Sequence, residues 1–300
     1  MSLRKVAIQG GAGSNHEIAA NAFFEEDSLE MVPCESFPEL FDTLKSDNSI
    51  YGIVAIENTL VGSILENYTL LKDSGLVIIG EYKLRIKHQL MTLPGQKIED
   101  ITEVHSHPMA LAQCRQFFKD YPHIKLISAD DTALSAKRIN DGQLTGVAAI
   151  APDLAAEQYN MEIIAQDIET NKRNFTRFLI VSDRGKTEVD DLLINNKINK
   201  SSIVFALPHS EGSLSKVLSI LAFYNINLTK IQSLPVVGQE WEYLFYVDLI
   251  FEDYIRYKQS LDAIKPLTKG LQSLGEYHVG KRSFDTVSND NKPLSEQKTF

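Results

Sequence analysis

The chain has 300 residues, a formal net charge of −10 and 43% hydrophobic residues. This length suggests about two domains, and the apolar fraction is enough for a packed core in each. The acidic balance disfavours nucleic acids and anionic membrane surfaces as partners, because phosphate binding needs a basic face. An anionic small substrate stays possible, since a local basic pocket can oppose the overall charge.

The two cysteines, Cys34 and Cys114, lie far apart in the sequence and have neither the number nor the spacing of a disulfide framework or a metal site. Reduced thiols are therefore expected. No N-terminal apolar run resembles a signal peptide, and no run of about 18 apolar residues predicts a membrane helix. These features together favour a cytoplasmic location.

Short apolar runs alternate with helical patterns over the first 180 residues. Strands are expected at residues 6–8, 53–56, 76–79 and 146–150. Helical patterns lie around 18–23, up to residue 71, at 111–118 and from 132 onward. Strands that alternate with helices indicate an α/β domain with mainly parallel pairing.

A polar stretch from 183 to 201 reads as a linker, and a smaller module follows it. Its expected strands are 203–207, 227–233 and 241–251, and its helices are 212–224 and 257–274. This βαββα order over about 75 residues is typical of a small ferredoxin-like sandwich. The polar tail that follows is expected to be disordered.

A glycine-rich loop, Gly10-Gly11-Ala12-Gly13-Ser14, joins the first expected strand to a helix. Backbone N–H groups at such a helix start can hold an anion. The loop does not have the G-x-G-x-x-G pattern, so it does not imply a dinucleotide. A plain tight turn is the alternative interpretation.

Polar residues also follow two later runs. Glu57-Asn58-Thr59 comes just past a strand, where ligands bind in open α/β sheets. Ser106-His107-Pro108 precedes a helix that carries Gln113. Helix capping explains the first segment equally well, and for Ser106 alone it is the favoured interpretation. His105 and His107 have no third ligand at a metal-binding spacing, and His88 reads as a histidine in or beside the core.

The segment Asn174-Phe175-Thr176-Arg177-Phe178 precedes an apolar strand. Its phenylalanines can exclude water, and Arg177 can bind a carboxylate with two parallel hydrogen bonds. Thr176 offers a neutral hydroxyl that stays protonated at physiological pH. The alternative is an ordinary strand start with an exposed arginine.

Taken together, these segments resemble a prephenate dehydratase with a C-terminal amino-acid-sensing ACT domain. The resemblance is carried by motifs similar to IENS-x-x-G-S at 56–63, SHPQALAQC at 106–114, STA at 131–133 and N-x-TRF at 174–178. In the second module, Gly212-Ser213-Leu214 is similar to the GAL motif of ACT domains.

The resemblance implies a two-lobed, type 2 periplasmic-binding-protein-like α/β catalytic domain over residues 1–182. The lobes would comprise about 1–79 plus 172–182, and 80–171, with the chain crossing between them near Gly80 and Thr170. A ferredoxin-like βαββαβ ACT domain would span 201–280, and residues 281–300 would form the disordered tail.

The implied reaction converts prephenate to phenylpyruvate with loss of carbon dioxide and water, and it needs no cofactor and no metal. Thr176 would donate a hydrogen bond to the departing hydroxide. The other catalytic candidates are Asn58, Ser106 and Glu57. Substrate-binding candidates are Arg177, Phe178, Asn174, Thr59, Gln113, Thr132, Ser14 and His16.

The ACT resemblance implies L-phenylalanine as an effector and a dimer or tetramer formed through ACT domains. The candidate effector-binding residues are His209, Gly212, Ser213, Leu214, Asn227 and Leu228. Some residues depart from the family pattern: His16 replaces a hydroxyl residue, and Gln232 and Leu234 stand where Glu and Arg are usual. Alternative functions are an arogenate dehydratase and a non-catalytic amino-acid-binding protein.

Overall fold

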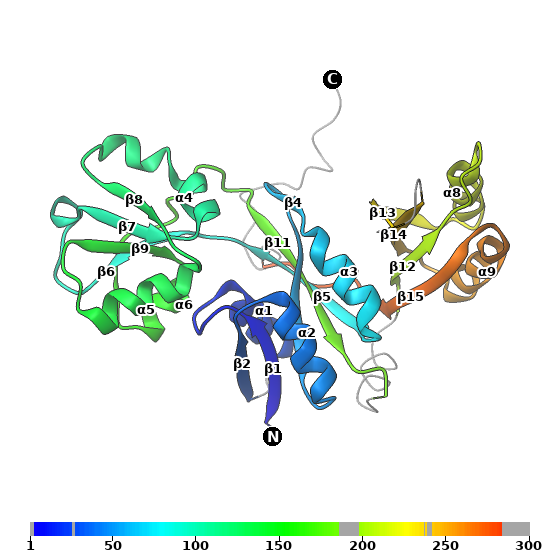
Figure 1. Ribbon diagram of the computed structural model, residues 1–300, viewed down its shortest axis with the longest axis horizontal. Coiled ribbons are helices and arrows are strands. Elements are labelled where there is room, and N and C mark those ends of the chain that lie inside the picture. Colours follow the sequence, from blue (N-terminus) through cyan, green and yellow to red (C-terminus); the bar gives the residue numbers. More distant parts are fainter. Residues whose placement is uncertain (1–2, 26–27, 186–197, 237, 239–241, 284–300) are drawn as a thin grey trace.

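The computed structural model describes residues 3–25, 28–185, 198–236, 238 and 242–283. They form three sheets that lie in a row, with the middle sheet between the two others (Figure 1). No helix in these ranges is both long and apolar enough to cross a membrane. The two cysteines are free and buried.

The first lobe is built on the middle sheet, whose strand order is β2-β1-β3-β11-β5, with β4 paired to β3. The strands are β1 (Arg4–Gln9), β2 (Leu29–Cys34), β3 (Tyr51–Asn58), β4 (Gly62–Ser63), β5 (Val77–Arg85) and β11 (Phe175–Ser182). β1 runs parallel to β2 and β3, whereas β11 is antiparallel to β3 and β5. Apolar side chains of α1 (Asn15–Phe24) cover one face, and those of α2 (Phe37–Ser46) and α3 (Leu65–Ser74) cover the other.

The second lobe has the strand order β10-β6-β9-β7-β8. Its strands are β6 (Gln89–Thr92), β7 (Glu103–Ser106), β8 (Lys125–Ser128), β9 (Val147–Ala151) and β10 (Glu162–Ala165). Its helices are α4 (Pro108–Cys114), α5 (Thr132–Gly142) and α6 (Asp153–Gln158), with short 3-10 turns at Ile98–Asp100 and Phe117–Asp120.

The expected crossing near Gly80 is wrong. β5 continues in the first-lobe sheet to Arg85, and the chain enters the second lobe only after that residue. The strand continues because β11 pairs with it along this whole stretch, from Gly80 opposite Ile180 to Arg85 opposite Phe175. The first lobe therefore includes residues 80–85, among them Glu81 and Lys83.

The third sheet belongs to a C-terminal module, residues 200–277, and its strand order is β13-β14-β12-β15 with antiparallel pairing throughout. Its elements are β12 (Lys200–Ala206), α8 (Ser213–Phe223), β13 (Asn227–Pro235), β14 (Tyr243–Ile250), α9 (Tyr254–Ile264), a 3-10 turn (Lys265–Leu267) and β15 (Lys269–Tyr277). This βαββαβ order confirms the ferredoxin-like fold.

The long helix expected over 257–274 is wrong in its second half. α9 ends at Ile264, and Pro266 lies in the turn that follows, because proline cannot continue a helix. β15 then pairs with β12, so the last strand completes the sheet.

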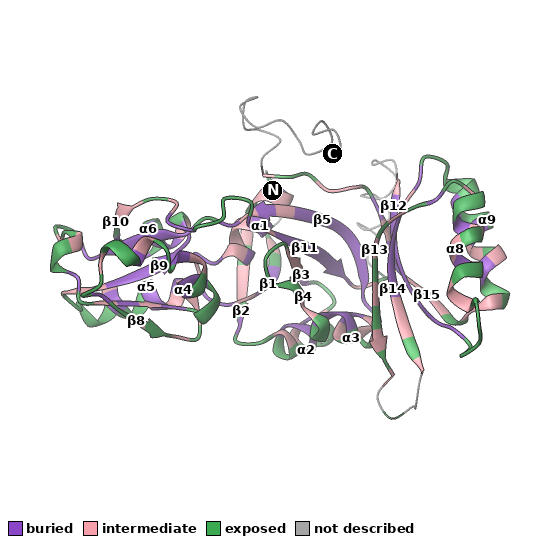
Figure 2. Cartoon of the chain, turned by 90° about the horizontal axis from the view of Figure 1, so that it is seen from above, coloured by how far each residue is buried: buried purple, intermediate pink, exposed green. Residues whose placement is uncertain are grey.

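The C-terminal sheet packs its inner face directly on the first lobe, with α8 and α9 on its far side (Figure 2). Val204, Tyr246 and Leu274 belong to the same apolar core as Ile78 and Leu179 of the first lobe. At Gly275 a Cβ would lie 2.3 Å from the Ile78 carbonyl oxygen, so only glycine allows this approach. The expected disorder is also wrong for residues 281–283, which make backbone hydrogen bonds to Lys83 of β5. Residues 284–300 of the tail lie outside the described residues.

Candidate active site

Two candidate catalytic side chains meet where β3 ends and β11 begins. Thr176 of β11 lies opposite Asn58 of β3 in the antiparallel register. The amide nitrogen of Asn58 donates to the Thr176 hydroxyl oxygen at 2.9 Å and to the side-chain oxygen of Asn174 at 2.8 Å. Strand pairing therefore brings together residues that are more than 110 positions apart in the sequence.

The orientation of the Asn58 amide is fixed by the backbone of the next turn. Its Oδ1 accepts hydrogen bonds from the N–H groups of Leu60 and Val61, at 2.8 and 3.1 Å. Only the NH₂ group can then face Thr176, whose oxygen must act as acceptor. In the described part of the chain no acceptor takes the Thr176 hydroxyl proton, so this proton remains available to a ligand.

Gln113 of α4 links the second lobe to the same network. Its Oε1 accepts a 2.8 Å hydrogen bond from Asn174 and lies 2.7 Å from Nε2 of His88. Because Oε1 is only an acceptor, Nε2 of His88 must carry the proton. Burial lowers the pKa of His88, which keeps the ring neutral. Both lobes thus contribute to one polar chain that ends at Thr176.

The glycine-rich loop lies against the second lobe rather than forming an isolated turn. A Cβ on Gly13 would lie 2.6 Å from Cα of Ala155, and one on Gly10 would lie 2.9 Å from the Asp131 carboxylate. Tyr159 also donates a 2.8 Å hydrogen bond to the Ala12 carbonyl oxygen. The glycines therefore allow the two lobes to close on each other.

Replacing Gly13 with alanine is expected to hold the lobes apart and to lower kcat/KM about a hundredfold, as misplacement of reacting groups by about 1 Å can do. Gly75→Ala is the matched control, since Gly75 has a similar φ of 77° against 80° but open space around a Cβ. Both variants should lose about 1–2 kcal/mol of stability from the left-handed backbone. Equal activities of the two variants would show that lobe closure at Gly13 is not needed.

Several other candidate residues have local partners in this structure. Ser14 caps α1 by accepting from the Glu17 N–H at 3.4 Å, and Thr132 is the first residue of α5. Thr59 donates to the Arg173 carbonyl oxygen at 2.9 Å and so ties the end of β3 to the start of β11. The buried Ser106 hydroxyl donates to the Ile150 carbonyl oxygen at 2.6 Å, while His107 caps α4.

His16 and Phe178 pack against each other in the first-lobe core. Their ring centroids are 4.9 Å apart in an edge-on arrangement, and Phe178 is only 1% exposed. Burial lowers the pKa of His16 to about 3, so the ring is neutral. This placement does not support Phe178 as a substrate-contacting residue, because its side chain belongs to the core.

The depressed pKa of His16 makes stability depend on pH. The unfolded chain gains a proton below pH 6.5, whereas the folded chain gains it only near pH 3. Stability should therefore fall as the pH falls from about 6.5 towards 3. Urea unfolding of His16→Leu should show a flatter decline between pH 7 and 5 than the wild type, and the exposed control His123→Leu should not. If the free energy of unfolding fell equally with pH in His16→Leu and in the wild type, the lowered pKa of His16 would be contradicted.

Arg177 points to the opposite face of β11 from Thr176, as successive strand residues do. Its Nε donates to Glu81 at 2.6 Å, its Nη1 pairs with Glu57 at 3.2 Å and with Asp248, and its Nη2 donates to Tyr277 at 3.1 Å. Four of the five guanidinium N–H groups therefore have acceptors. The side chain is only 6% exposed and already paired, so this arrangement does not support Arg177 as a substrate-carboxylate ligand.

The ion pairs around Arg177 form a cluster at the junction of the first lobe and the C-terminal module. This junction cluster comprises three carboxylates and three cations among the described residues, namely Glu57, Glu81, Asp248, Arg177, Lys200 and Lys230. Burial raises the pKa of Glu81, but Arg177 and Lys200 outweigh it and set it to about 2. The three positive and three negative charges of the cluster balance one another.

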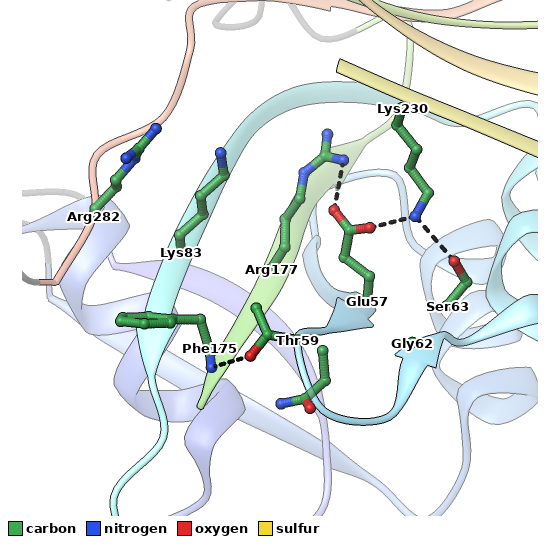
Figure 3. A pocket seen from close by; sticks show the side chains of 10 residues that line it. Glu57, Thr59, Gly62, Ser63, Lys83, Phe175, Arg177, Lys230 and Arg282 are labelled. Carbon is green, nitrogen blue, oxygen red and sulfur yellow. Dashed lines mark hydrogen bonds and ion pairs between the residues drawn. The ribbon is translucent and has the colours of Figure 1, made fainter. Parts of the chain in front are cut away.

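Glu57 stands at the exposed end of the junction cluster, between Arg177 and Lys230 (Figure 3). Burial raises the pKa of Glu57, but the Lys230 hydrogen bond and the two cations lower it more. Beside it is a cavity of about 540 Å³, which Lys83, Phe175 and Arg282 also line. Asn58, Thr59 and Arg177 line this cavity and Thr176 does not, so it opens mainly on the face of β11 that carries Arg177.

The candidate effector-binding residues lie on the C-terminal module away from Thr176. Gly212, with a φ of 73°, precedes α8, where Ser213 and Leu214 form the first turn. His209 lies in the exposed loop before them, and Asn227 and Leu228 begin β13. No cluster of residues that could hold a metal ion occurs in the ranges that the structure describes.

A family model for prephenate dehydratase matches residues 6–186, which is more than half of the chain. The chain belongs to the prephenate dehydratase family. The Arabidopsis thaliana protein named arogenate dehydratase/prephenate dehydratase 2 is 37% identical over 287 residues, covering 92% of this chain and 73% of that protein.

Among solved structures, prephenate dehydratase from Arthrobacter aurescens in complex with L-Phe is 26% identical with a TM-score of 0.78, covering 91% of this chain and 89% of that one. GqqA, titled a novel type of quorum quenching acylase, is 27% identical with a TM-score of 0.82, covering 92% and 98%. These likenesses agree with the fold and extend through the C-terminal module.

Four members of the junction cluster in this prephenate dehydratase family member were not among the site residues predicted from the sequence. Glu81, Lys200, Lys230 and Asp248 are charged residues at strand positions that pack against another module. For Glu81 and Asp248 the available signal was their place within largely apolar strands, where an unpaired charge would be costly. The partners themselves depend on how the modules dock.

Proposed function

We propose that this protein catalyses the decarboxylating dehydration of prephenate to phenylpyruvate. The observation that carries the proposal is the orientation of Thr176, whose oxygen accepts from Asn58 and whose proton is free to be donated. Asn58, Asn174, Thr176 and Gln113, all candidates from the sequence, lie in one hydrogen-bonded chain between the lobes.

In this reaction the bond between the ring and its carboxylate breaks and releases carbon dioxide. The electron pair moves through the ring, and the bond from the opposite ring carbon to the hydroxyl group breaks. Hydroxide is a poor leaving group, so a hydrogen bond from Thr176 would stabilise it as it departs. The released electrons leave with hydroxide, and for this reason the step requires no cofactor.

The substrate carboxylates need partners other than Arg177. We assign the pyruvyl carboxylate to the N-terminus of α1, where it would take the Gly13 N–H that Glu17 accepts at 2.6 Å in this structure. The N-terminus of α5 is not assigned, because the Asp131 carboxylate already caps it. Helix N-termini offer N–H donors and a favourable dipole to an anion. The ring carboxylate should be desolvated rather than paired, since a strong ion pair would stabilise the ground state.

The test is to incubate the purified protein with prephenate or with arogenate and to identify the products. Phenylpyruvate from prephenate is the expected result. Phenylalanine formed from arogenate alone would favour the second candidate, an arogenate dehydratase, which the name of the Arabidopsis relative also supports. Binding of L-phenylalanine without turnover of either compound would favour a non-catalytic binding protein.

We further propose that the C-terminal module is an ACT domain that binds L-phenylalanine and joins two copies of the chain. The L-Phe complex of the Arthrobacter structure and the ferredoxin-like topology support this proposal. β13 is an edge strand with Ile231 45% exposed, and Phe223 of α8 is 76% exposed. Gel filtration and activity with and without L-phenylalanine test it, and no change in either would leave the module without an effector role.

A further inference from the structure

Two charged side chains of the C-terminal module reach the strands that carry the candidate catalytic pair. Lys230 of β13 forms an ion pair with Glu57 of β3 and a 2.9 Å hydrogen bond to Ser63 of β4. Asp248 of β14 forms an ion pair with Arg177 of β11. The C-terminal module therefore holds one residue on each of the two central strands.

The residues held in this way are the immediate neighbours of the candidate catalytic pair. Arg177 lies opposite Glu57 in the register, and Thr176 lies opposite Asn58. A regular strand has about 3.3 Å between successive residues, so the two pairs share one stretch of backbone. The Glu57–Arg177 pair is therefore the next pair along the same two strands from Asn58 and Thr176.

The two ends of the junction cluster differ in burial, and this difference indicates which ion pair can rearrange. Arg177 and Asp248 are 6% and 9% exposed, so the contact between them is fixed by its dry surroundings. Lys230 and Glu57 are 13% and 32% exposed, and Glu57 lines the open cavity of Figure 3. The Lys230–Glu57 pair is therefore the adjustable contact between the C-terminal module and the catalytic strands.

We propose that Lys230 and Asp248 are positioning residues for the dehydratase reaction. By holding Glu57 and Arg177, they set the alignment of Asn58 with Thr176, and they give the C-terminal module a direct route to the reacting hydroxyl. The expected effect on turnover rests on the proposed function, whereas the expected effect on the alignment of β3 and β11 does not. Neither residue contacts the substrate in this scheme.

The test replaces Lys230 with methionine, which removes the ammonium but can keep the contact with the Tyr68 ring, 5.5 Å away. Lys230→Met is expected to lower kcat about 2- to 30-fold, the range typical of coupling networks, with KM changed less than twofold. Lys230→Arg should restore most of kcat, because it keeps a cation beside Glu57.

The matched control is Lys269→Met, which removes another strand lysine whose ion pair, with Glu242 at 3.3 Å, stays within the C-terminal module. It should keep wild-type kcat. A wild-type kcat for Lys230→Met, or an equal loss in Lys230→Met and Lys269→Met, would overturn the proposal. A rise in KM at unchanged kcat would also overturn it, because it would indicate substrate binding instead.

Hydrogen exchange separates this proposal from the proposed function. The backbone amides of residues 174–178 should exchange faster in Lys230→Met than in the wild type, and Lys230→Arg should reverse the change. Unchanged exchange in this segment would contradict the proposal that Lys230 holds the catalytic strands in place, even if the enzyme is active. A wild-type protein that turns over neither prephenate nor arogenate would instead refute the proposed function and leave the exchange result to stand alone.

Discussion

Replacing Thr176 with alanine is expected to lower kcat about 10²- to 10⁴-fold, the range typical of a lost proton donor. The hydroxyl oxygen already accepts from Asn58, so the hydroxyl proton is not used in that bond and can be donated to a ligand. Serine at this position keeps the hydroxyl but loses the methyl group that restricts its rotation. Thr176→Ser should therefore keep more activity than Thr176→Ala.

Steady-state kinetics with prephenate provide the measurement, and circular dichroism confirms that each variant is folded. Asn58→Asp provides a further comparison, because it replaces the NH₂ donor with an acceptor, to which the Thr176 hydroxyl would donate the proton that the reaction needs. Near-native turnover in folded Thr176→Ala would remove Thr176 from the reaction. Equal losses in the alanine and serine variants would show that packing rather than the hydroxyl is needed.

The network around Thr176 could be predicted because its residues belong to short motifs at strand ends. Asn58 and Asn174 were identified next to apolar runs, and Gln113 follows a helix start. Alternation along a strand also separates Thr176 from Arg177 onto opposite faces. The sequence could not assign a partner to each face, since that depends on which module packs there.

Arg177 illustrates this limit. A cation beside a catalytic threonine suggests a substrate carboxylate, and residue types alone do not argue against it. Its acceptors Asp248 and Tyr277 lie 71 and 100 residues further along the chain, on strands of another module. One of these, Tyr277 on β15, lies just past a stretch that was expected to be helical. Without that strand, the sequence does not predict which element packs on the face of β11 that carries Arg177.

Replacing Arg177 with methionine is expected to destabilise the protein by about 3–5 kcal/mol, the usual cost of removing one partner of a buried ion pair. Glu81 is completely buried and Asp248 is 9% exposed, and both would lose a cation. Arg177→Lys should lose less, about 1.5–3 kcal/mol, because one ammonium cannot replace all the charged hydrogen bonds of the guanidinium. Urea unfolding measures both changes.

Arg184→Met is the matched control, since Arg184 is exposed and donates one hydrogen bond, to the Ser273 carbonyl oxygen at 3.2 Å. Its effect should stay within about 0.5 kcal/mol. If Arg177 instead bound a substrate carboxylate, Arg177→Lys would raise KM at nearly unchanged stability. That result would return Arg177 to the substrate site, whereas a loss of stability with little change in KM would place it in the junction between the modules.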